Sequence, residues 1–353
     1  MTNEIYRIGI VGASSLTGKE LNDALGESLL ADSDVVLLDD DDTVGQMTAT
    51  GDEASFIQRL EPSAFERLDF VFFAGDAATT KKHWQDARRA GASIVDLTYA
   101  LDGKKDVLVR SPWVAGALAD KEKTPHQEKK PDLNTHAVVA AHPAAVMIAL
   151  ATARLHGKLP LTSVAAVVME PASQHGRLAM DELHQQTVNL LSFQSLPREQ
   201  YDAQAAFNLL PELGEAAAVK LAATGEHIRE QYAAMSGGAL PPLALQMSQA
   251  PVFHGYVLSL LVGFANPVTT EQVSSAVAGE HISVVAPGQD APSNLSATGR
   301  DDVLVRVSKG SGGDGPDTRF WLWMAADNLK LTALNAIACA VELRRLRPLG
   351  KVQ

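Results

Sequence analysis

The sequence contains a single cysteine, Cys339, among its 353 residues. One cysteine excludes an internal disulfide framework and is typical of a reducing compartment, so we expect a cytoplasmic protein. No apolar run reaches the ~18–20 residues that a membrane-spanning helix needs, and the first residues lack the basic-then-apolar layout of a secretion signal. These absences predict that the protein neither spans a membrane nor binds one.

Basic residues are also in deficit: Lys and Arg number 30 against 42 Asp and Glu, for a formal net charge of −12. This balance disfavours nucleic acid as a partner, because phosphate binding relies on a basic surface. The ten histidines show no HExxH or Cys-x-x-Cys partner spacing, so no metal site is expected. The 46% hydrophobic content and the length favour a globular chain of two domains.

The first third of the chain alternates continuous apolar strands with amphipathic helices. Strands are expected in "YRIGIVGA", "SDVVLLD", "LDFVFFAG" and "SIVDLT", and helices in "TGKELNDALGESL" and "KKHWQDARRAGA". This pattern predicts an α/β fold in which a parallel sheet is covered on both faces, that is, a Rossmann-type doubly wound domain. Residues 115–134 are charged and contain proline, and we expect a surface loop there. Later apolar runs predict a second α/β domain, and the last stretch predicts a helix.

A glycine-containing loop, "GIVGASSLTGKEL", joins the first strand to the first helix. Backbone N–H groups at a helix N-terminus bind a pyrophosphate, and glycines let the ligand approach. Ser15 replaces the middle glycine of a G-x-x-G-x-x-G loop, which crowds such a ligand. The loop therefore predicts either a dinucleotide site or a plain tight turn. Its candidate cofactor-binding residues are Gly12, Ser14, Ser15, Leu16 and Thr17.

Four acidic residues, Asp39 to Asp42, follow the second expected strand. A carboxylate at this place can bind a ribose 2′-hydroxyl, whereas a 2′-phosphate needs Arg or Lys. If a dinucleotide binds, NAD is favoured over NADP, and Asp39 is the candidate ligand. A solvated acidic turn that binds neither cofactor is the alternative.

Seven segments in the same order resemble the aspartate-semialdehyde dehydrogenase family over nearly the whole chain. They are "GIVGASSLTGKEL", "FFAGDAA", "AGASIVDLT", "AAHPAAV", "AFNLLPELGE", "APVFHGY" and "WMAADNLKLTALNA". The resemblance implies a Rossmann-type dinucleotide-binding-like domain at 1–141, a dimerisation domain at 142–327, and a C-terminal helix at 328–353 that returns to the first domain. Family members form homodimers and reduce an acyl phosphate with NADPH through a cysteine thioester.

Five positions depart from the chemistry that the resemblance implies. In "AAHPAAV", Ala145 stands where the family has its nucleophilic cysteine, and Tyr256 stands where it has its acid/base histidine. Glu170 replaces a glutamine, and Gln249 and Asp102 replace the arginines that hold the substrate carboxylate and phosphate. The chain is therefore similar to the USG-1-type relatives that lack the nucleophile. No catalytic residue is predicted for the family reaction.

Other nucleophiles and proton donors are weak candidates. Cys339 lies among apolar residues of the last helix, where a free cysteine usually packs as a small apolar residue. Ser173 and His175 share one loop and could pair, although a solvated loop is the simpler interpretation. His254 lies two residues before Tyr256, and a slip of that segment would bring it to the acid/base place, at the cost of misplacing Pro251 and Gly255.

Some binding features of the family persist. Glu226 and Arg229 match an acid and base three residues apart that help to hold substrate, although a surface ion pair explains them equally well. Asn328 matches a position that faces the nicotinamide end of the cofactor, or else it caps the final helix. Gly75, in "FFAGDAA", completes the set of cofactor-binding candidates.

Three functions remain open on these residues. The first is a catalytically inactive homologue that keeps NAD-type binding and homodimerisation. The second is an active NAD(P)-dependent oxidoreductase that transfers hydride directly, with Tyr256, Glu170 or His254 supplying protons. The third is a non-catalytic regulatory protein that forms mixed dimers with a true dehydrogenase or binds another protein.

Overall fold

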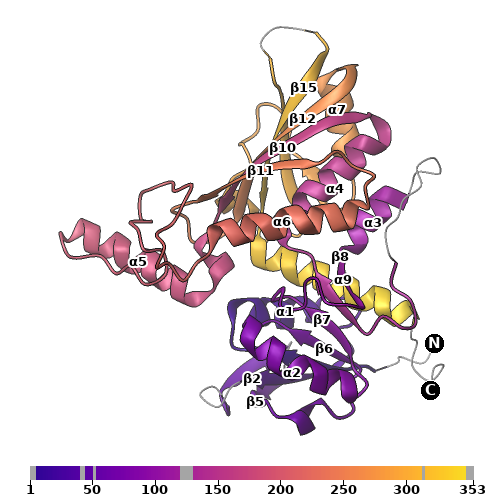
Figure 1. Ribbon diagram of the computed structural model, residues 1–353, viewed down its shortest axis with the longest axis vertical. Coiled ribbons are helices and arrows are strands. Elements are labelled where there is room, and N and C mark those ends of the chain that lie inside the picture. Colours follow the sequence, from indigo (N-terminus) through magenta and orange to yellow (C-terminus); the bar gives the residue numbers. More distant parts are fainter. Residues whose placement is uncertain (1–4, 40–43, 51–52, 120–129, 312–314, 347–353) are drawn as a thin grey trace. The chain divides into compact units, whose positions relative to one another are not determined.

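The computed structural model describes residues 5–39, 44–50, 53–119, 130–311 and 315–346. It divides into two compact units (Figure 1). The first comprises Met1–Pro112, Lys129–His142 and Thr332–Gln353, and the second comprises Trp113–Glu128 and Pro143–Leu331. The expected α/β fold class, with the last helix returning to the N-terminal domain, is confirmed.

The first unit contains a seven-stranded sheet of order β5-β2-β1-β6-β7-β9-β8, in which the neighbouring strands are parallel. A separate two-stranded hairpin, β3–β4, was not expected from the sequence. The elements are β1 (Arg7–Val11), α1 (Leu16–Gly26), β2 (Asp34–Asp39), β3 (Met47–Thr50), β4 (Glu53–Phe56), β5 (Gln58–Arg59), the 3-10 helix η2 (Pro62–Phe65), β6 (Phe70–Phe73), α2 (Ala77–Arg89), β7 (Ser93–Asp96), β8 (Val107–Arg110), β9 (Ala137–Ala140) and, from Thr332 onward, α9 (Asn328–Leu346).

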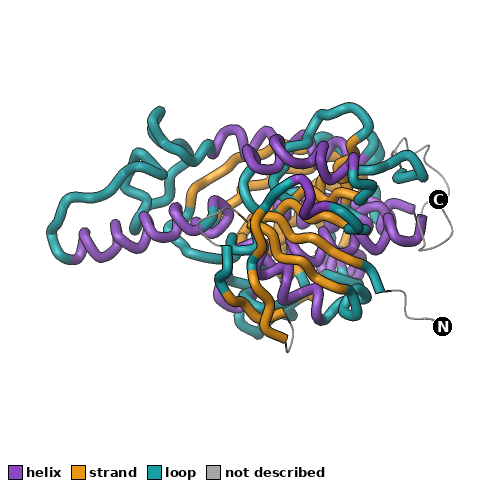
Figure 2. Tube along the Cα trace, turned by 90° about the horizontal axis from the view of Figure 1, so that it is seen from below, coloured by secondary structure: helices purple, strands orange, loops and turns teal. Residues whose placement is uncertain are grey.

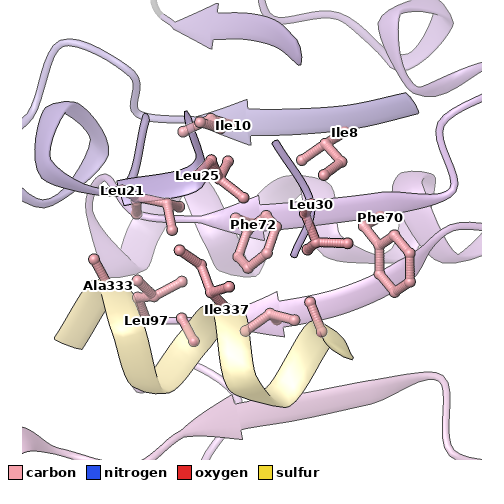
Figure 3. Packing of buried hydrophobic residues seen from close by; sticks show 14 of the residues in the cluster. Ile8, Ile10, Leu21, Leu25, Leu30, Phe70, Phe72, Leu97, Ala333 and Ile337 are labelled. Carbon is pink, nitrogen blue, oxygen red and sulfur yellow. The ribbon is translucent and has the colours of Figure 1, made fainter. Parts of the chain in front are cut away.

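Both faces of this sheet are buried, as its continuous apolar strands require. One face packs against α1 and α9, and Figure 3 shows Leu21 and Leu25 of α1 opposite Ala333 and Ile337 of α9, with Phe72 of the sheet between them. The other face packs against α2 and η2. The apolar stripe of α9 therefore belongs to the core of the first unit, although most of the second unit precedes it in the chain.

The second unit is built on a six-stranded mixed sheet of order β11-β10-β12-β15-β14-β13. Its elements are α3 (Pro112–Ala119), α4 (Pro143–Lys158), β10 (Leu161–Glu170), the 3-10 helix η3 (Ala172–His175), α5 (Arg177–Leu191), α6 (Leu221–Ser236), β11 (Leu243–Gln249), β12 (Tyr256–Val268), α7 (Thr270–Val277), β13 (Ile282–Val284), α8 (Asn294–Ala297), β14 (Val303–Lys309) and β15 (Asp317–Ala326).

The two faces of the mixed sheet differ. Helices α4, α6 and α7 pack on one face. On the other face the side chains that alternate with the core are partly exposed, and Trp321 and Trp323 each keep 37% of their surface accessible. Helix α5 and the segment after it extend away from this sheet (Figures 1 and 2).

The expected loop at 115–134 is wrong at its beginning. Helix α3 continues to Ala119, and its Trp113 ring stacks on His281 at a centroid distance of 4.0 Å. This stacking helps to explain why α3 falls in the second unit rather than in the N-terminal domain. Residues 120–129 lie outside the described part, as do Asp40 to Asp42.

Candidate active site

The junction between β9 and α4 carries no nucleophile. Pro143 opens α4, where its missing N–H costs nothing. Ala145 follows in the first turn and is fully buried. His142, which precedes the helix, is also buried, and its ring lies 5.3 Å from that of Tyr99. This turn supplies backbone geometry and apolar packing but no group that attacks a substrate.

A closed group of polar side chains forms where β10 and β11 end and β12 begins. We call Glu170, His175, Gln249 and Tyr256 the Glu170 cluster. The Tyr256 hydroxyl donates to Oε1 of Glu170 at 2.9 Å, and His175 Nε2 lies 3.0 Å from Oε2. Gln249 pairs with Glu170 in the strand register and donates its amide to the carbonyls of Glu170 and Ala250 at 3.0 and 3.1 Å.

Burial and charge compete within the Glu170 cluster. Glu170, Gln249 and Tyr256 have no exposed surface. Burial disfavours the protonated form of His175, but the charge of Glu170 and the hydrogen bond to it together outweigh this effect, so the pKa of His175 is raised above its usual value. The raised pKa favours a buried ion pair of Glu170 and His175.

A second group of hydrogen-bonded side chains lies beside the first. We call Ser173, His254, Asp327 and Asn328 the Ser173 network. Ser173 Oγ is 3.1 Å from His254 Nδ1, and His254 Nε2 is 2.9 Å from Asp327 Oδ1. Ser173 Oγ is also 3.1 Å from Asn328 Oδ1, which accepts the Gly255 N–H at 3.0 Å. The His254 side chain remains 24% exposed.

The partners in the Ser173 network differ from those that the sequence suggested. Ser173 pairs with His254 and not with His175, which contacts Glu170 instead. Tyr256 is in register with Ala326 of β15, and His254 lies before the first residue of β12. Asp327 was not among the site residues predicted from the sequence. Its position before the first residue of α9 is an N-cap signal, and its carboxylate does accept the Lys330 N–H at 3.1 Å.

Two further predicted contacts are absent. Asn328 is the first residue of α9, but the capping contact is made by Asp327. Glu226 and Arg229 lie exposed on α6, and no ion pair joins them in the described part of the chain. Asp102 lies in the first unit, in a turn where its N–H donates to Tyr99 O at 3.3 Å.

Cys339 does not replace the missing nucleophile. It is fully buried on α9, and its thiol is directed at the Arg110 carbonyl at 3.6 Å. Burial strongly raises the pKa of the thiol, so the reactive thiolate is not formed at neutral pH. The prediction that Cys339 packs as an apolar residue is consistent with this environment.

The glycine loop of the first unit is tightly packed. Gly12 has φ +82°, and a Cβ there would lie 2.3 Å from the backbone of Gly75. Ser15 Oγ accepts the Gly18 N–H and donates to the Ala74 carbonyl, both at 2.8 Å. Both observations give the loop a structural reason for its residues that needs no ligand.

The same loop nevertheless keeps features that fit a pyrophosphate. The N–H groups of Leu16 and Thr17 open α1 and have no acceptor among the residues that the structure describes. Asp39, at the end of β2, accepts the Ser14 N–H at 2.7 Å and is half-buried. Free donors at a helix N-terminus suit an anion, and the nearby carboxylate suits a ribose hydroxyl rather than a phosphate.

The described residues contain no group of three or more His, Cys, Asp or Glu side chains that could hold a metal ion. No helix within them is long and apolar enough to cross a membrane. A doubly wound unit with a glycine loop, followed by a mixed-sheet unit with a polar cluster at its strand ends, defines a two-unit α/β protein with a Rossmann-type first unit.

Comparison with known proteins makes this class specific. The model of the semialdehyde dehydrogenase NAD binding domain matches residues 7–121, and that of the semialdehyde dehydrogenase dimerisation domain matches residues 152–331. The chain belongs to the semialdehyde dehydrogenase family. The expected family resemblance is thus confirmed.

Several relatives cover nearly the whole chain. A USG-1 protein homolog of Pseudomonas aeruginosa is 29% identical over 333 residues, 94% of this chain and 95% of that protein. An aspartate-semialdehyde dehydrogenase of Rickettsia bellii is 22% identical over 346 residues, 96% of this chain and 97% of its own.

Among solved structures, a probable aspartate-semialdehyde dehydrogenase from Pseudomonas aeruginosa has a TM-score of 0.82 at 25% identity and covers 98% of this chain and 99% of its own. Aspartate semialdehyde dehydrogenase II from Vibrio cholerae has a TM-score of 0.83 at 21% identity, with coverages of 97% and 99%.

Proposed function

We propose that this protein is an inactive homologue of the family with respect to its cysteine-dependent reaction. The observation that carries the proposal is Ala145, an alanine fully buried in the first turn of α4 where the resemblance expects the nucleophilic cysteine. Without a thiolate no thioester forms, and the loss of a nucleophile alone commonly costs several orders of magnitude in rate.

The Glu170 cluster supports the same proposal. Tyr256 and Glu170 hydrogen-bond to each other in a fully buried pair, so neither presents a proton donor to a substrate. Gln249 uses its amide for two backbone carbonyls and lacks the charge of an arginine. The burial of Tyr256 and Glu170 also removes two of the three proton donors on which direct hydride transfer would depend.

The test is an assay of the purified protein with aspartate semialdehyde, phosphate, and NAD or NADP, run beside an active family member. We expect turnover to be lower by about 10⁴-fold or more, since a nucleophile and its acid/base partner are both missing. The Ala145→Cys variant should stay inactive, because Tyr256 and Gln249 are unchanged. Turnover of the unmodified protein within about tenfold of the active relative would contradict the proposal.

We further propose that the first unit binds NAD rather than NADP. Leu16 and Thr17 supply the N–H groups for the pyrophosphate, and Asp39 supplies the acceptor for a ribose hydroxyl. A bound nicotinamide would provide hydride chemistry, which the proposed function does not require. Calorimetric titration should show NAD binding that Ser15→Gly strengthens, because the glycine frees the Gly18 N–H and removes the crowding side chain. NADP binding tighter than NAD binding would contradict this preference.

Homodimerisation belongs to the same proposal. The matched dimerisation domain carries a partly exposed apolar sheet face with Trp321 and Trp323, and a groove beside Trp321 is lined by Val167 and Leu245. A Trp321→Lys substitution should convert a dimer to a monomer in sedimentation experiments, since it buries a charge in an apolar contact. A Leu191→Lys variant, also at an exposed apolar residue but on α5, serves as the control. If Trp321→Lys stays dimeric, this face is not the interface.

We also propose a cytoplasmic location, because a sequence with a single cysteine is typical of a reducing compartment. Mixed dimers with an active relative remain a further candidate role, for which the matched dimerisation domain is the supporting observation.

A further inference from the structure

The Ser173 network contains a serine, a histidine and an aspartate in direct succession. The distances of 3.1 Å from Ser173 Oγ to His254 Nδ1 and of 2.9 Å from His254 Nε2 to Asp327 Oδ1 both lie within the range of about 2.6–3.2 Å for a nucleophile and its base. The three residues come from η3, from the segment before β12, and from the start of α9. Nothing in the proposed function uses them.

Asp327 is held as a carboxylate. Burial opposes its charge, but hydrogen bonds from His254, the Gly299 N–H and the Lys330 N–H outweigh this penalty, so the pKa of Asp327 is lowered. An ionised Asp327 accepts the Nε2–H of His254. The neutral imidazole then carries its lone pair on Nδ1, the nitrogen that faces Ser173.

Asn328 fixes the other side of the serine hydroxyl. The Gly255 N–H donates to Asn328 Oδ1, which sets the orientation of the carboxamide and makes its oxygen the atom that faces Ser173. The Ser173 hydroxyl therefore has two acceptors, His254 Nδ1 and Asn328 Oδ1, and donates to one at a time. When His254 is protonated, Nδ1–H donates to Ser173 Oγ and the serine proton turns to Asn328.

We propose that Ser173, His254 and Asp327 form a nucleophilic site that accepts the acyl group of small activated carboxylic esters. The roles of the two ring nitrogens are exchanged relative to the serine-protease arrangement, but either nitrogen is a competent base when the other is held protonated. Ser173 is only 2% exposed, and the His254 side chain, 24% exposed, is the part of the network that solvent reaches most.

The reaction balances with water as the only co-reactant. Ser173 Oγ bonds to the ester carbonyl carbon, its proton passes to His254 Nδ1, and the bond from that carbon to the alkoxy oxygen breaks. The imidazolium returns the proton to the departing alcohol. A water molecule then attacks the acyl-serine, gives one proton to His254, and releases the carboxylic acid while Ser173 regains its hydroxyl.

The surrounding side chains indicate an uncharged acyl group. Asp327, held as a carboxylate, lies directly beyond His254 from Ser173, so a substrate carboxylate would be repelled. Phe253, whose carbonyl accepts the Ser173 N–H at 2.9 Å, is 39% exposed and offers an apolar contact. These features favour a short neutral acyl chain such as acetyl.

The first experiment uses p-nitrophenyl acetate and a fluorophosphonate probe on the full-length protein without a dinucleotide. We expect hydrolysis, and labelling at Ser173, that Ser173→Ala abolishes and His254→Gln slows by about 10²-fold or more. Ser192→Ala, at an exposed serine after α5, should change neither. Absence of labelling, labelling at another serine, or labelling unaffected by His254→Gln would overturn the proposal.

A second measurement does not depend on ester turnover. In Ser173→Cys, the new thiol should react with iodoacetamide near neutral pH as an ionised thiolate paired with protonated His254, while the buried Cys339 stays unmodified. Adding His254→Gln should slow alkylation by about tenfold and move its pH profile to that of an ordinary thiol. Equal rates and profiles with and without His254 would overturn the proposal, whatever the dehydrogenase assay shows.

Discussion

Residues 170–176 contribute to two polar groups, the Glu170 cluster and the Ser173 network, that differ in their hydrogen bonding. The Glu170 cluster is sealed, since three of its four members, Glu170, Gln249 and Tyr256, have no exposed surface. The Ser173 network is almost as buried, and its partly exposed His254, at 24%, is matched by His175, at 18%. We call it open because the Ser173 hydroxyl has two alternative acceptors. The comparison teaches that buried polar side chains at one end of a sheet need not share a role, because the hydrogen bonds that each makes decide which groups remain available to another molecule.

The largest expected loss of stability comes from a substitution in the Glu170 cluster. His175→Gln removes the charged partner of the buried Glu170 carboxylate and keeps the hydrogen bond from the Tyr256 hydroxyl. Removing one partner of a buried ion pair commonly costs about 3–5 kcal/mol, and the partial exposure of His175 places our expectation near 3 kcal/mol. Urea unfolding at pH 6 and constant protein concentration measures the loss.

The matched control neutralises both partners. Glu170→Gln combined with His175→Gln should destabilise less than His175→Gln alone, because no unpaired charge remains buried. A loss below about 1 kcal/mol for the single variant would show that Glu170 is already neutral or solvated in the folded protein.

A smaller loss in the free energy of unfolding is expected when Asp327 of the Ser173 network is changed. Asp327→Asn keeps an acceptor for the Lys330 N–H but weakens the charged contacts to His254 and the Gly299 N–H. Hydrogen bonds to a charged group contribute about 1.5–3 kcal/mol, and the retained cap reduces the expected loss in unfolding free energy to about 2 kcal/mol. The same variant should slow labelling of Ser173. Unchanged labelling with lowered stability would leave Asp327 a purely structural residue.

Local pattern explains what the sequence could predict of the fold. The alternation of strands and helices, the glycine loop and the last helix follow from periodicity over short stretches, which is why the doubly wound unit was foreseen. Residues 115–119 of helix α3 were expected as loop because they begin a charged stretch that contains proline, whereas the Trp113 ring packs on His281, far away in the chain.

The site was less accessible to prediction, because its contacts join distant segments. Ser173 and His254 are 81 residues apart, and no spacing rule links them, so the nearer His175 was the natural but wrong partner. Asp327 was recognisable only as a helix cap. The burial of Glu170 and Tyr256 depends on the register of β10, β11 and β12, which the sequence does not specify.

A modest loss of stability is expected when the Tyr256 hydroxyl is removed. Tyr256→Phe keeps the ring and removes the hydroxyl that donates to Glu170 at 2.9 Å. We expect a loss of about 1–2 kcal/mol in the free energy of unfolding, since a buried acceptor loses one of its donors. Circular dichroism in a denaturant series is sufficient to measure it. A neutral or stabilising result would mean that the ring packing, and not the hydroxyl, determines this position.

The smallest effect is a difference in pH dependence between the two groups. The pKa of His175 is raised from 6.5, so the stability that its pairing contributes is complete below pH 6.5 and is lost as the pH rises through the folded-state pKa. The pKa of Asp327 is lowered from 3.8, so its contribution is complete above pH 3.8 and is lost as the pH falls through the folded-state pKa. The difference in free energy of unfolding between the unmodified protein and His175→Gln should therefore decrease from pH 6 to pH 9. The corresponding difference for Asp327→Asn should stay constant over that range and decrease only in acid. Parallel pH profiles for the two variants would show that the groups titrate as one site and that the sealed and open clusters are not independent.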